Sequence, residues 1–186
     1  MDKEGIHTKC LDRLVDNDSR VLIVGTLPGQ ESINAGRYYA DKKNQFWNIL
    51  YGAFNVPYDS RITDKEKCDF LRLHRIALWD VLEKGERKGS SSDKDIHRPV
   101  MNDFEELFTK YPLLRKVIIN SKGLKKGRNK EMKDIAKRLK SVFDRYGITY
   151  EYLHSTSWRI RYKTEEIDKW HEILRDFVLE KERPFC

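Results

Sequence analysis

The chain has 186 residues, with 37 Lys and Arg against 30 Asp and Glu, which gives a formal net charge of +7. Charged residues make up 36% of the chain, yet aromatic residues reach 11%, so we expect a folded protein rather than a disordered one. No apolar run approaches the roughly 20 residues that a membrane helix needs. The first residues also lack an apolar signal region. We therefore expect neither a membrane protein nor a secreted one.

The cysteines and histidines argue against a metal centre. Cys10, Cys68 and Cys186 are spread over the chain without a CxxC pair, and the five histidines form no HxH or HExxH pair. A structural zinc or an iron–sulfur cluster needs about four clustered ligands. We therefore expect no metal. Unpaired cysteines are typical of a reducing compartment, so we expect a cytoplasmic protein, associated with the nucleoid if the source is prokaryotic.

Short apolar runs that fit buried strands alternate with helical patterns along the chain. The predicted strands cover residues 20–25, 78–82 (preceded by Ile76), 116–119 and 148–153. The predicted helices cover residues 44–54, 64–74, 104–110 after a cap at Asn102-Asp103, 130–146, and a last one from Thr164. Residues 85–93, with three serines, are expected to form a flexible loop. The alternation predicts an α/β fold with a parallel central sheet, and the length predicts a single domain over residues 1–186.

The segment Gly25-Thr26-Leu27-Pro28-Gly29 follows the first predicted strand. Ligands of parallel α/β folds bind at the carboxyl ends of the strands, and glycines allow close approach of the backbone to a ligand. The segment matches neither GxxxxGK[ST] nor GxGxxG, so it supports neither a nucleoside triphosphate loop nor a dinucleotide loop. Taken alone, it is best interpreted as a tight turn.

The stretch from Gly36 to Leu50 changes this interpretation. It contains Tyr38-Tyr39-Ala40 and then Asn44-Gln45-Phe46-Trp47 at the start of a predicted helix. Together with the GxxPG loop, these segments resemble the uracil-DNA glycosylase superfamily, and within it most of all the hypoxanthine-DNA (deoxyinosine) glycosylase family. The resemblance extends from about residue 20 to residue 173. It includes Leu-Trp-Asp-Val-Leu at 78–82, Arg-Lys-Gly-Ser at 87–90, Asn-Asp-Phe at 102–104 and Ser-Thr-Ser at 155–157.

This resemblance implies a three-layer α/β/α sandwich with a central, mostly parallel four-stranded sheet. It implies a monofunctional DNA glycosylase that flips a deaminated base, with hypoxanthine as the expected one, out of double-stranded DNA. Such an enzyme hydrolyses the N-glycosidic bond and leaves an abasic site, as a monomer and without a metal or organic cofactor. The alternatives are a uracil or mismatch glycosylase of the same superfamily, or a catalytically inactive homologue that binds nucleic acid.

The resemblance also implies a set of site residues. Mismatch-type relatives read Gly-Ile-Asn-Pro-Gly in the loop, and their Asn positions the attacking water; here Leu27 stands in its place and cannot do so. The hypoxanthine family instead implies Asn44 as the catalytic residue. The implied base-binding residues are Gly25, Thr26, Leu27, Pro28, Gly29, Tyr39, Phe46 and His154, with Tyr39 stacking on the flipped base. Without the resemblance, Asn44 would be interpreted as a helix N-cap and Tyr39 as a core residue.

The last predicted strand leads into a serine-rich loop. Family members usually read Pro-Ser-Thr-Ser-Pro here, whereas in this chain His154 precedes the serines and Trp158 follows them. Hydroxyl groups suit DNA phosphates, and a large apolar side chain suits the gap that a flipped base leaves. The expected DNA contacts are Arg87, Lys88, Ser155, Thr156, Ser157, Trp158, Arg159 and Arg161, with Trp158 as a candidate wedge. For His154, a base contact and a structural role stay open.

The density of Lys and Arg between residues 122 and 145 has two interpretations. A DNA-binding face is one, and a solvated helix surface is the other, which we favour because the binding mouth is expected at the strand ends. The positive charge of the whole chain then indicates affinity for DNA phosphates without placing the contact.

Overall fold

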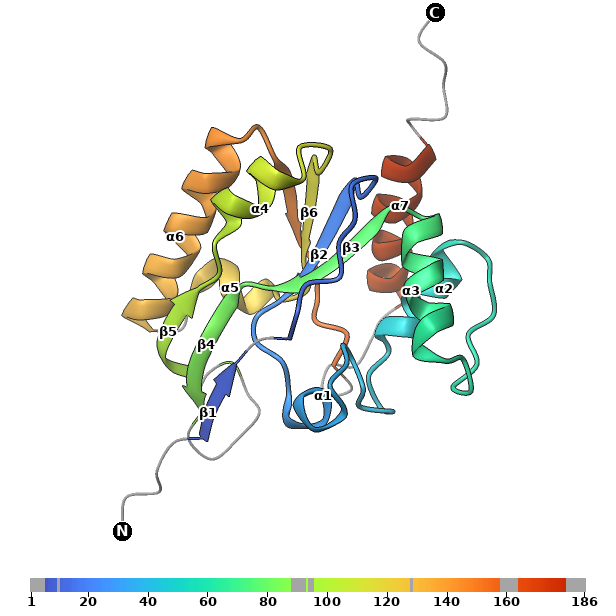
Figure 1. Cartoon of the computed structure of the whole chain (residues 1–186), viewed down its shortest axis with the longest axis horizontal. Helices are drawn as coiled ribbons and strands as arrows, with labels where there is room; N and C mark the ends of the chain where they lie inside the picture. The colour runs from blue at the N-terminus through green and yellow to red at the C-terminus, as the bar shows by residue number, and fades with distance from the viewer. Residues whose placement is uncertain are drawn as a thin grey trace, which may run out of the picture.

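The computed structural model describes residues 6–9, 11–87, 93, 96–127, 129–157 and 164–179. Figure 1 shows a four-stranded sheet between two layers of helices. The strand order is β3 (Ile76–Asp80), β2 (Val21–Gly25), β6 (Lys116–Ile119) and β7 (Thr149–Tyr152), and all three pairings are parallel. The predicted three-layer fold is therefore confirmed.

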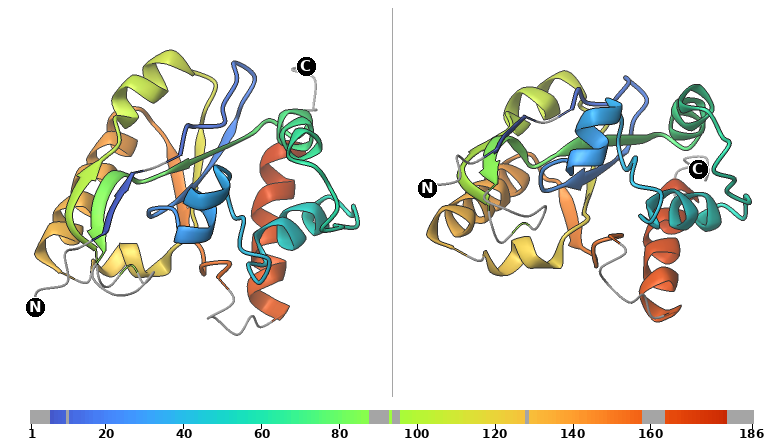
Figure 2. Two further views of the ribbon diagram at one scale, coloured as in Figure 1. Left: turned by 60° about the horizontal axis from the view of Figure 1, so that its bottom comes forward. Right: turned by 90° about the horizontal axis from the view of Figure 1, so that it is seen from below.

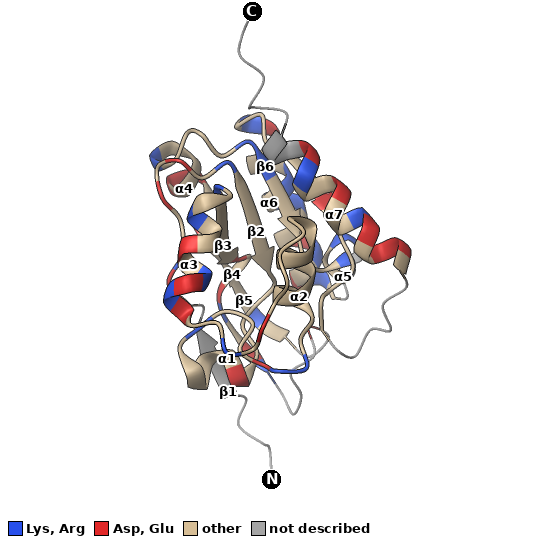
Figure 3. Ribbon diagram, turned by 90° about the vertical axis from the view of Figure 1, so that its right-hand side faces the viewer, with Lys and Arg blue, Asp and Glu red and all other residues tan. Residues whose placement is uncertain are grey.

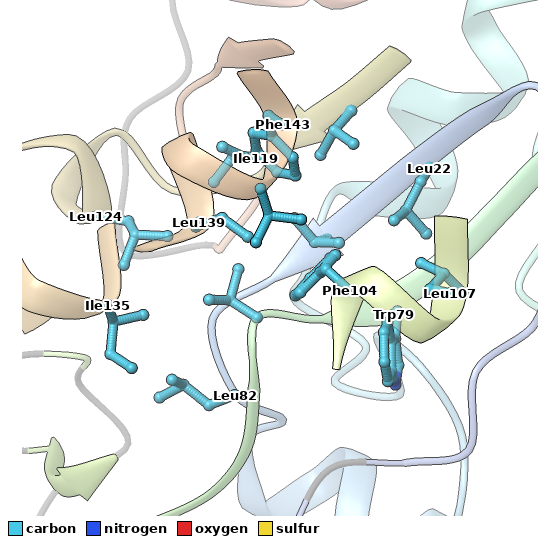
Figure 4. Close-up of a cluster of buried hydrophobic side chains, with 14 of the residues drawn as sticks. Leu22, Trp79, Leu82, Phe104, Leu107, Ile119, Leu124, Ile135, Leu139 and Phe143 are labelled. Carbon is cyan, nitrogen blue, oxygen red and sulfur yellow. The ribbon is translucent and has the colours of Figure 1, made fainter. Parts of the chain in front are cut away.

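The two faces of this sheet bury alternate residues of the same strands, as a pleated strand requires. Leu22 and Val24 of β2 face a cluster with α4 (Phe104–Lys110) and α6 (Lys130–Arg145), part of which Figure 4 shows. Val21 and Ile23 face the opposite cluster. That cluster is built on α2 (Phe46–Ala53), α3 (Asp64–Leu73) and α7 (Thr164–Leu179). Burial on both faces explains why these strands read as unbroken apolar runs.

The helix α6 carries the apolar stripe that its sequence predicts. Its buried residues are Met132, Ile135, Leu139, Val142 and Phe143, and its Lys and Arg side chains point away from the core. Figure 3, which faces α3 and α7, shows the same division, with charged residues along the helices and none drawn on the labelled β2 strand. The lysines of α6 therefore lie on an exposed helix surface. Within the described residues, no helix is long and apolar enough to span a bilayer.

A second, antiparallel sheet was not predicted. It pairs β1 (Ile6–Lys9) with β4 (Leu82–Arg87), and β4 with β5 (Ile96–Met101). Figure 2 shows it beside the parallel sheet, and β5 packs on α6. The short helices α1 (Gln30–Ala35) and α5 (Lys122–Lys126) were also not predicted.

The second sheet corrects two predictions. The strand predicted to run to Leu82 ends at Asp80, and Leu82 begins β4. Residues 85–87, predicted as part of a flexible loop, are the end of β4. The apolar run continues across this boundary because Val81 and Leu82 are fully buried. The apolar pattern alone therefore could not show where the chain leaves one sheet and enters the other.

The buried stripe of α6 gives a direct test of the core. Leu139 is completely buried and Leu73, at the end of α3, is 75% exposed. We expect Leu139→Ala to lower the free energy of unfolding by about 2–5 kcal/mol, because it removes buried methyl groups and leaves a cavity. The matched change Leu73→Ala should cost less than about 0.5 kcal/mol. Urea unfolding followed by circular dichroism measures both, and equal losses would contradict this placement of α6.

Candidate active site

A cleft of about 760 Å³ opens at the carboxyl edge of the parallel sheet. The glycine loop, the segment from Arg37 to Asn44, and residues that follow the other strands line it. The structure brings together these sequence-predicted site residues: Gly25, Thr26, Leu27, Pro28, Gly29, Tyr39, Asn44, Arg87, Ser155 and Ser157. Parallel strands place all their carboxyl ends at one edge, which is why residues so far apart in sequence meet there.

The glycine loop is fixed from behind by the second sheet. The backbone N–H groups of Val81 and Leu82 donate to the carbonyl oxygens of Gly25 and Thr26, at 2.8 and 3.0 Å. The side chain of Leu27, at 6% exposure, packs into the core beside β4 and β5. The loop therefore turns its backbone toward the cleft while its one large side chain holds it to the core.

Arg87, expected from the sequence to contact DNA, is buried and completes this attachment of the loop. Its side chain is 8% exposed, and its guanidinium donates to the carbonyl oxygens of Pro28 and Leu27, the latter at 2.9 Å. Asp93 lies 3.5 Å away. Burial lowers the pKa of Arg87, and the charge of Asp93 opposes that shift. Arg87 therefore holds the glycine loop in place. Its guanidinium is buried within the fold and hydrogen-bonds to the backbone of the loop.

Tyr39 presents an aromatic ring to the cleft. Its backbone is left-handed, with φ of 53°, a conformation that costs a non-glycine residue about 1–3 kcal/mol unless its surroundings hold it. Two contacts do so: the ring stacks on Phe46 with centroids 3.6 Å apart, and its hydroxyl accepts a hydrogen bond from Asn120 Nδ2 at 3.2 Å. Burial raises the pKa of the Tyr39 hydroxyl, which stays neutral. Phe46, at 1% exposure, supports the ring from behind and is not among the described cleft-lining residues.

Asn44 lines the cleft at the start of α2. Its side-chain Oδ1 accepts a hydrogen bond from the backbone N–H of Phe46 at 3.0 Å, and its own N–H donates to the carbonyl oxygen of Asp41 at 2.9 Å. Asn44 is not the N-cap of α2, which is Gln45, but it holds the start of the helix through its bond to Phe46. An amide oxygen has two lone pairs and its NH₂ group two hydrogens, so a side chain that is fixed at the helix start can still bind a ligand in the cleft.

Asn120, which was not predicted as a site residue, joins three parts of the site. It follows β6, and its side chain exchanges hydrogen bonds of 2.9 Å with the hydroxyl and the backbone N–H of Thr156, besides holding Tyr39. Thr156 is fully buried, so it anchors the serine loop from inside, while Ser155 and Ser157 line the cleft. An amide at the end of an apolar strand was the signal in the sequence.

The structure does not bring His154 into the cleft. Its Nε2 lies 3.1 Å from a carboxylate oxygen of Glu166 on α7, and its backbone oxygen accepts from the indole of Trp170 at 3.2 Å. It is not among the described residues that line the cleft. This placement favours the structural interpretation. The predicted DNA contacts Lys88, Trp158, Arg159 and Arg161 lie outside the described residues.

Asp80 is a functional candidate that the sequence reasoning missed. It ends β3 directly beside Gly25, lines the cleft and is 3% exposed. Burial raises its pKa to about 7; the charge of Arg87 opposes this shift and that of Asp93 adds to it. Among the described residues, none hydrogen-bonds to its buried Oδ2. One signal in the sequence was available: Asp80 is the single charged residue in the apolar run from Ile76 to Leu82.

The family model of the uracil DNA glycosylase superfamily matches residues 13–177 of this chain. The chain therefore belongs to the uracil DNA glycosylase superfamily. Two curated relatives, from Methanosarcina acetivorans and Methanosarcina barkeri, are named hypoxanthine DNA glycosylase. They are 35% and 33% identical over 109 residues, which is 59% of this chain and 68% of each relative.

A solved structure supports the fold over nearly the whole chain. It is the solution NMR structure of a Methanosarcina acetivorans protein provisionally named a uracil DNA glycosylase. The two structures superimpose with a TM-score of 0.76 at 26% sequence identity, covering 92% of this chain and 99% of that one.

The buried carboxyl of Asp80 predicts how stability varies with pH. Its pKa of about 7 in the folded protein lies above its ordinary value of 3.8, so the native state binds the extra proton. The stability that this proton contributes is complete below about pH 4. It is lost as the pH rises to about 7, by an amount on the order of 4 kcal/mol at most.

The change Asp80→Asn removes this titration while keeping the shape of the side chain. We expect the free energy of unfolding of the variant, relative to the wild type, to increase between about pH 5 and about pH 8. Urea unfolding at both pH values measures the difference. A difference that does not change with pH would show that the carboxyl is ionised throughout this range.

Proposed function

We propose that this chain is a DNA glycosylase that removes hypoxanthine from double-stranded DNA by hydrolysing the N-glycosidic bond, and that residues 1–186 act as one domain. The observation that carries the proposal is the meeting of an aromatic platform and an uncharged amide, Tyr39 and Asn44, in one cleft beside a glycine loop. The names of the two relatives support the choice of base.

The cleft suits a single base that has left the duplex. Extrusion of a base costs a few kcal/mol, and less for a mispaired base such as hypoxanthine. Stacking on an aromatic side chain contributes about 1–3 kcal/mol per base, which offsets part of this cost. Phe46 covers one face of the Tyr39 ring, so the base stacks on the other, and Asn120 keeps the ring from turning away.

The chemistry needs an attacking water and stabilisation of the departing base. In our proposal Asn44 orients the water toward C1′ of the sugar; an amide can do this without placing a charge next to the oxocarbenium-like transition state. The backbone N–H groups of the glycine loop stabilise the charge that develops on the base. Arg87 and the backbone of β4 already hold that loop in place, so little reorganisation is needed during the reaction.

The serine loop supplies contacts to the DNA backbone. Ser155 and Ser157 lie at the cleft, where their hydroxyl groups can bind the phosphates that flank the extruded nucleotide. The net charge of +7 adds an attraction to DNA that does not depend on base sequence and weakens as salt concentration rises.

Labelled duplexes test the proposal. The protein is incubated with duplexes that carry inosine, uracil, xanthine or a thymine mispair, and abasic sites are then cleaved with alkali. We expect the inosine duplex to be cut fastest. Faster cleavage of uracil would identify a uracil or mismatch glycosylase, and binding of duplexes without cleavage would identify an inactive homologue.

The role of Asn44 predicts a loss of rate. We expect Asn44→Ala to lower the single-turnover rate on inosine DNA by about 10²-fold or more, because the attacking water is no longer positioned. Asn48→Ala provides a matched control. Asn48 is exposed on the same helix, and its side chain contacts Gln45 rather than the cleft. An Asn44→Ala protein that cuts as fast as the wild type would contradict the assignment.

The role of Tyr39 predicts a loss of substrate affinity. We expect Tyr39→Ala to raise the concentration of inosine duplex needed for half-maximal rate by roughly 5- to 150-fold, the equivalent of about 1–3 kcal/mol of stacking. Tyr39→Phe keeps the ring and loses only the hydrogen bond from Asn120, so its effect should be several-fold smaller. Equal effects of the two changes would show that the hydroxyl, rather than the ring, binds the base.

A further inference from the structure

The carboxyl group of Asp80 fits against Gly25 because that residue has no side chain. A Cβ atom on Gly25 would lie 2.6 Å from Asp80 Oδ1 and 3.7 Å from the hydroxyl oxygen of Tyr39. The carboxyl therefore packs directly over the Cα of Gly25, close to the platform that we propose for the base. The Asp80 carboxyl and the Tyr39 hydroxyl thus both lie beside Gly25.

Among the described residues, one oxygen of this carboxyl lacks the hydrogen-bond partner that a buried carboxylate usually has. Its Oδ2 is buried and, across the described residues, receives no hydrogen bond. The neighbouring polar groups are already engaged: Asn120 binds Tyr39 and Thr156, and Arg87 binds the carbonyl oxygens of the loop. A buried ionised carboxylate without a partner is costly, so a proton or a ligand must satisfy this oxygen.

Burial favours the protonated form of Asp80, and the charged groups around it only partly oppose this effect. In the part of the chain that the structure describes, Arg87 on β4 is the cation that acts on Asp80, and its guanidinium also binds Asp93 and the loop carbonyls. Asp93 acts in the opposite direction, and Tyr39 is neutral. Burial outweighs the attraction of Arg87, and the pKa of Asp80 rises to about 7, which leaves a large protonated fraction near neutral pH.

We propose that Asp80 is the general acid that donates a proton to the departing purine. The inference rests on the proposed function, because it concerns the base that this cleft would bind. An ionised carboxylate at this place would repel the negative charge that develops on the base and slow the reaction. A protonated carboxyl removes that charge as it forms.

The step balances as follows. The O–H bond of Asp80 breaks and an N–H bond forms at N7 of hypoxanthine. The electrons of the C1′–N9 bond move into the base, which leaves as neutral hypoxanthine. The water held by Asn44 forms the new C1′–O bond and releases its proton to solvent. Asp80 is left ionised and regains a proton from solvent before the next turnover.

This assignment accounts for a preference for purines. Hypoxanthine has a basic ring nitrogen at N7, whereas uracil offers only carbonyl oxygens, which are much weaker bases. Proton donation from Asp80 therefore accelerates the loss of a deaminated purine far more than the loss of uracil, and Asp80 determines specificity as well as rate.

The test compares single-turnover rates of wild type and Asp80→Asn on inosine DNA between about pH 5.5 and about pH 9. We expect the wild-type rate to fall on the alkaline side, approaching tenfold per pH unit. We expect Asp80→Asn to be roughly 10²- to 10⁴-fold slower and to lack this alkaline fall. Asp144→Asn, which changes an exposed carboxylate of α6, is the matched control and should behave as wild type.

A second substrate separates proton donation from binding. Duplexes that carry 7-deazainosine lack the N7 lone pair, so wild type and Asp80→Asn should cut them at the same low rate. Binding of inosine duplex, measured by fluorescence anisotropy, should be within a few-fold for the two proteins. A loss of binding that explains the whole loss of rate would overturn the assignment of a general acid.

The remaining outcomes are also decisive. A wild type that cuts inosine DNA, with an Asp80→Asn variant of similar rate or with the same alkaline fall, overturns the inference alone. A wild type that cuts no inosine DNA overturns the proposed function and the inference with it. If Asp80→Asn does not fold, the wild type alone tests the inference. Proton donation is excluded if the wild-type rate on inosine DNA does not fall at alkaline pH. It is also excluded if the wild type cuts 7-deazainosine DNA as fast as inosine DNA.

Discussion

The site depends on the parallel pairing of β2 with a neighbour on each side. That pairing sets Gly25 opposite Asp80, and the same ladder lets the N–H of Asn120 donate to the carbonyl oxygen of Val24. Gly25, Asp80 and Asn120, at the ends of three neighbouring strands, are thereby fixed at one edge of the sheet, because backbone hydrogen bonds set the register of the strands. The loops that directly follow these strands line the cleft.

The fold could be predicted largely because the parallel strands are buried on both faces. Short apolar runs such as residues 116–119 predict a buried strand. The apolar stripe of α6 predicts which side of that helix packs on the sheet. The second sheet could not be predicted in the same way. Its central strand β4 carries charged residues at four of six positions and a glycine, and its partner β1 is far away in sequence. Such a strand is recognisable only once its neighbours are in place.

The same distinction separates the site residues that were predicted from those that were missed. Tyr39 and Asn44 belong to a local segment whose sequence resembles a known family, so they could be named without a structure. Asp80 and Asn120 are recognisable as site residues only from their contacts with segments far away in sequence. The burial of Arg87 could not be predicted, because a sequence shows that a charge is present but not how deeply the fold encloses it.

The contact between Gly25 and Asp80 has a consequence for how this cleft can change. With only 2.6 Å between a would-be Cβ and the carboxyl oxygen, a larger residue at position 25 fits only after Asp80 has shortened or moved. The two positions are therefore coupled: any side chain at position 25 requires the Asp80 carboxyl to shift or to be replaced. A larger side chain at Gly25 therefore clashes with the Asp80 carboxyl, whereas a shorter side chain at position 80 removes that clash.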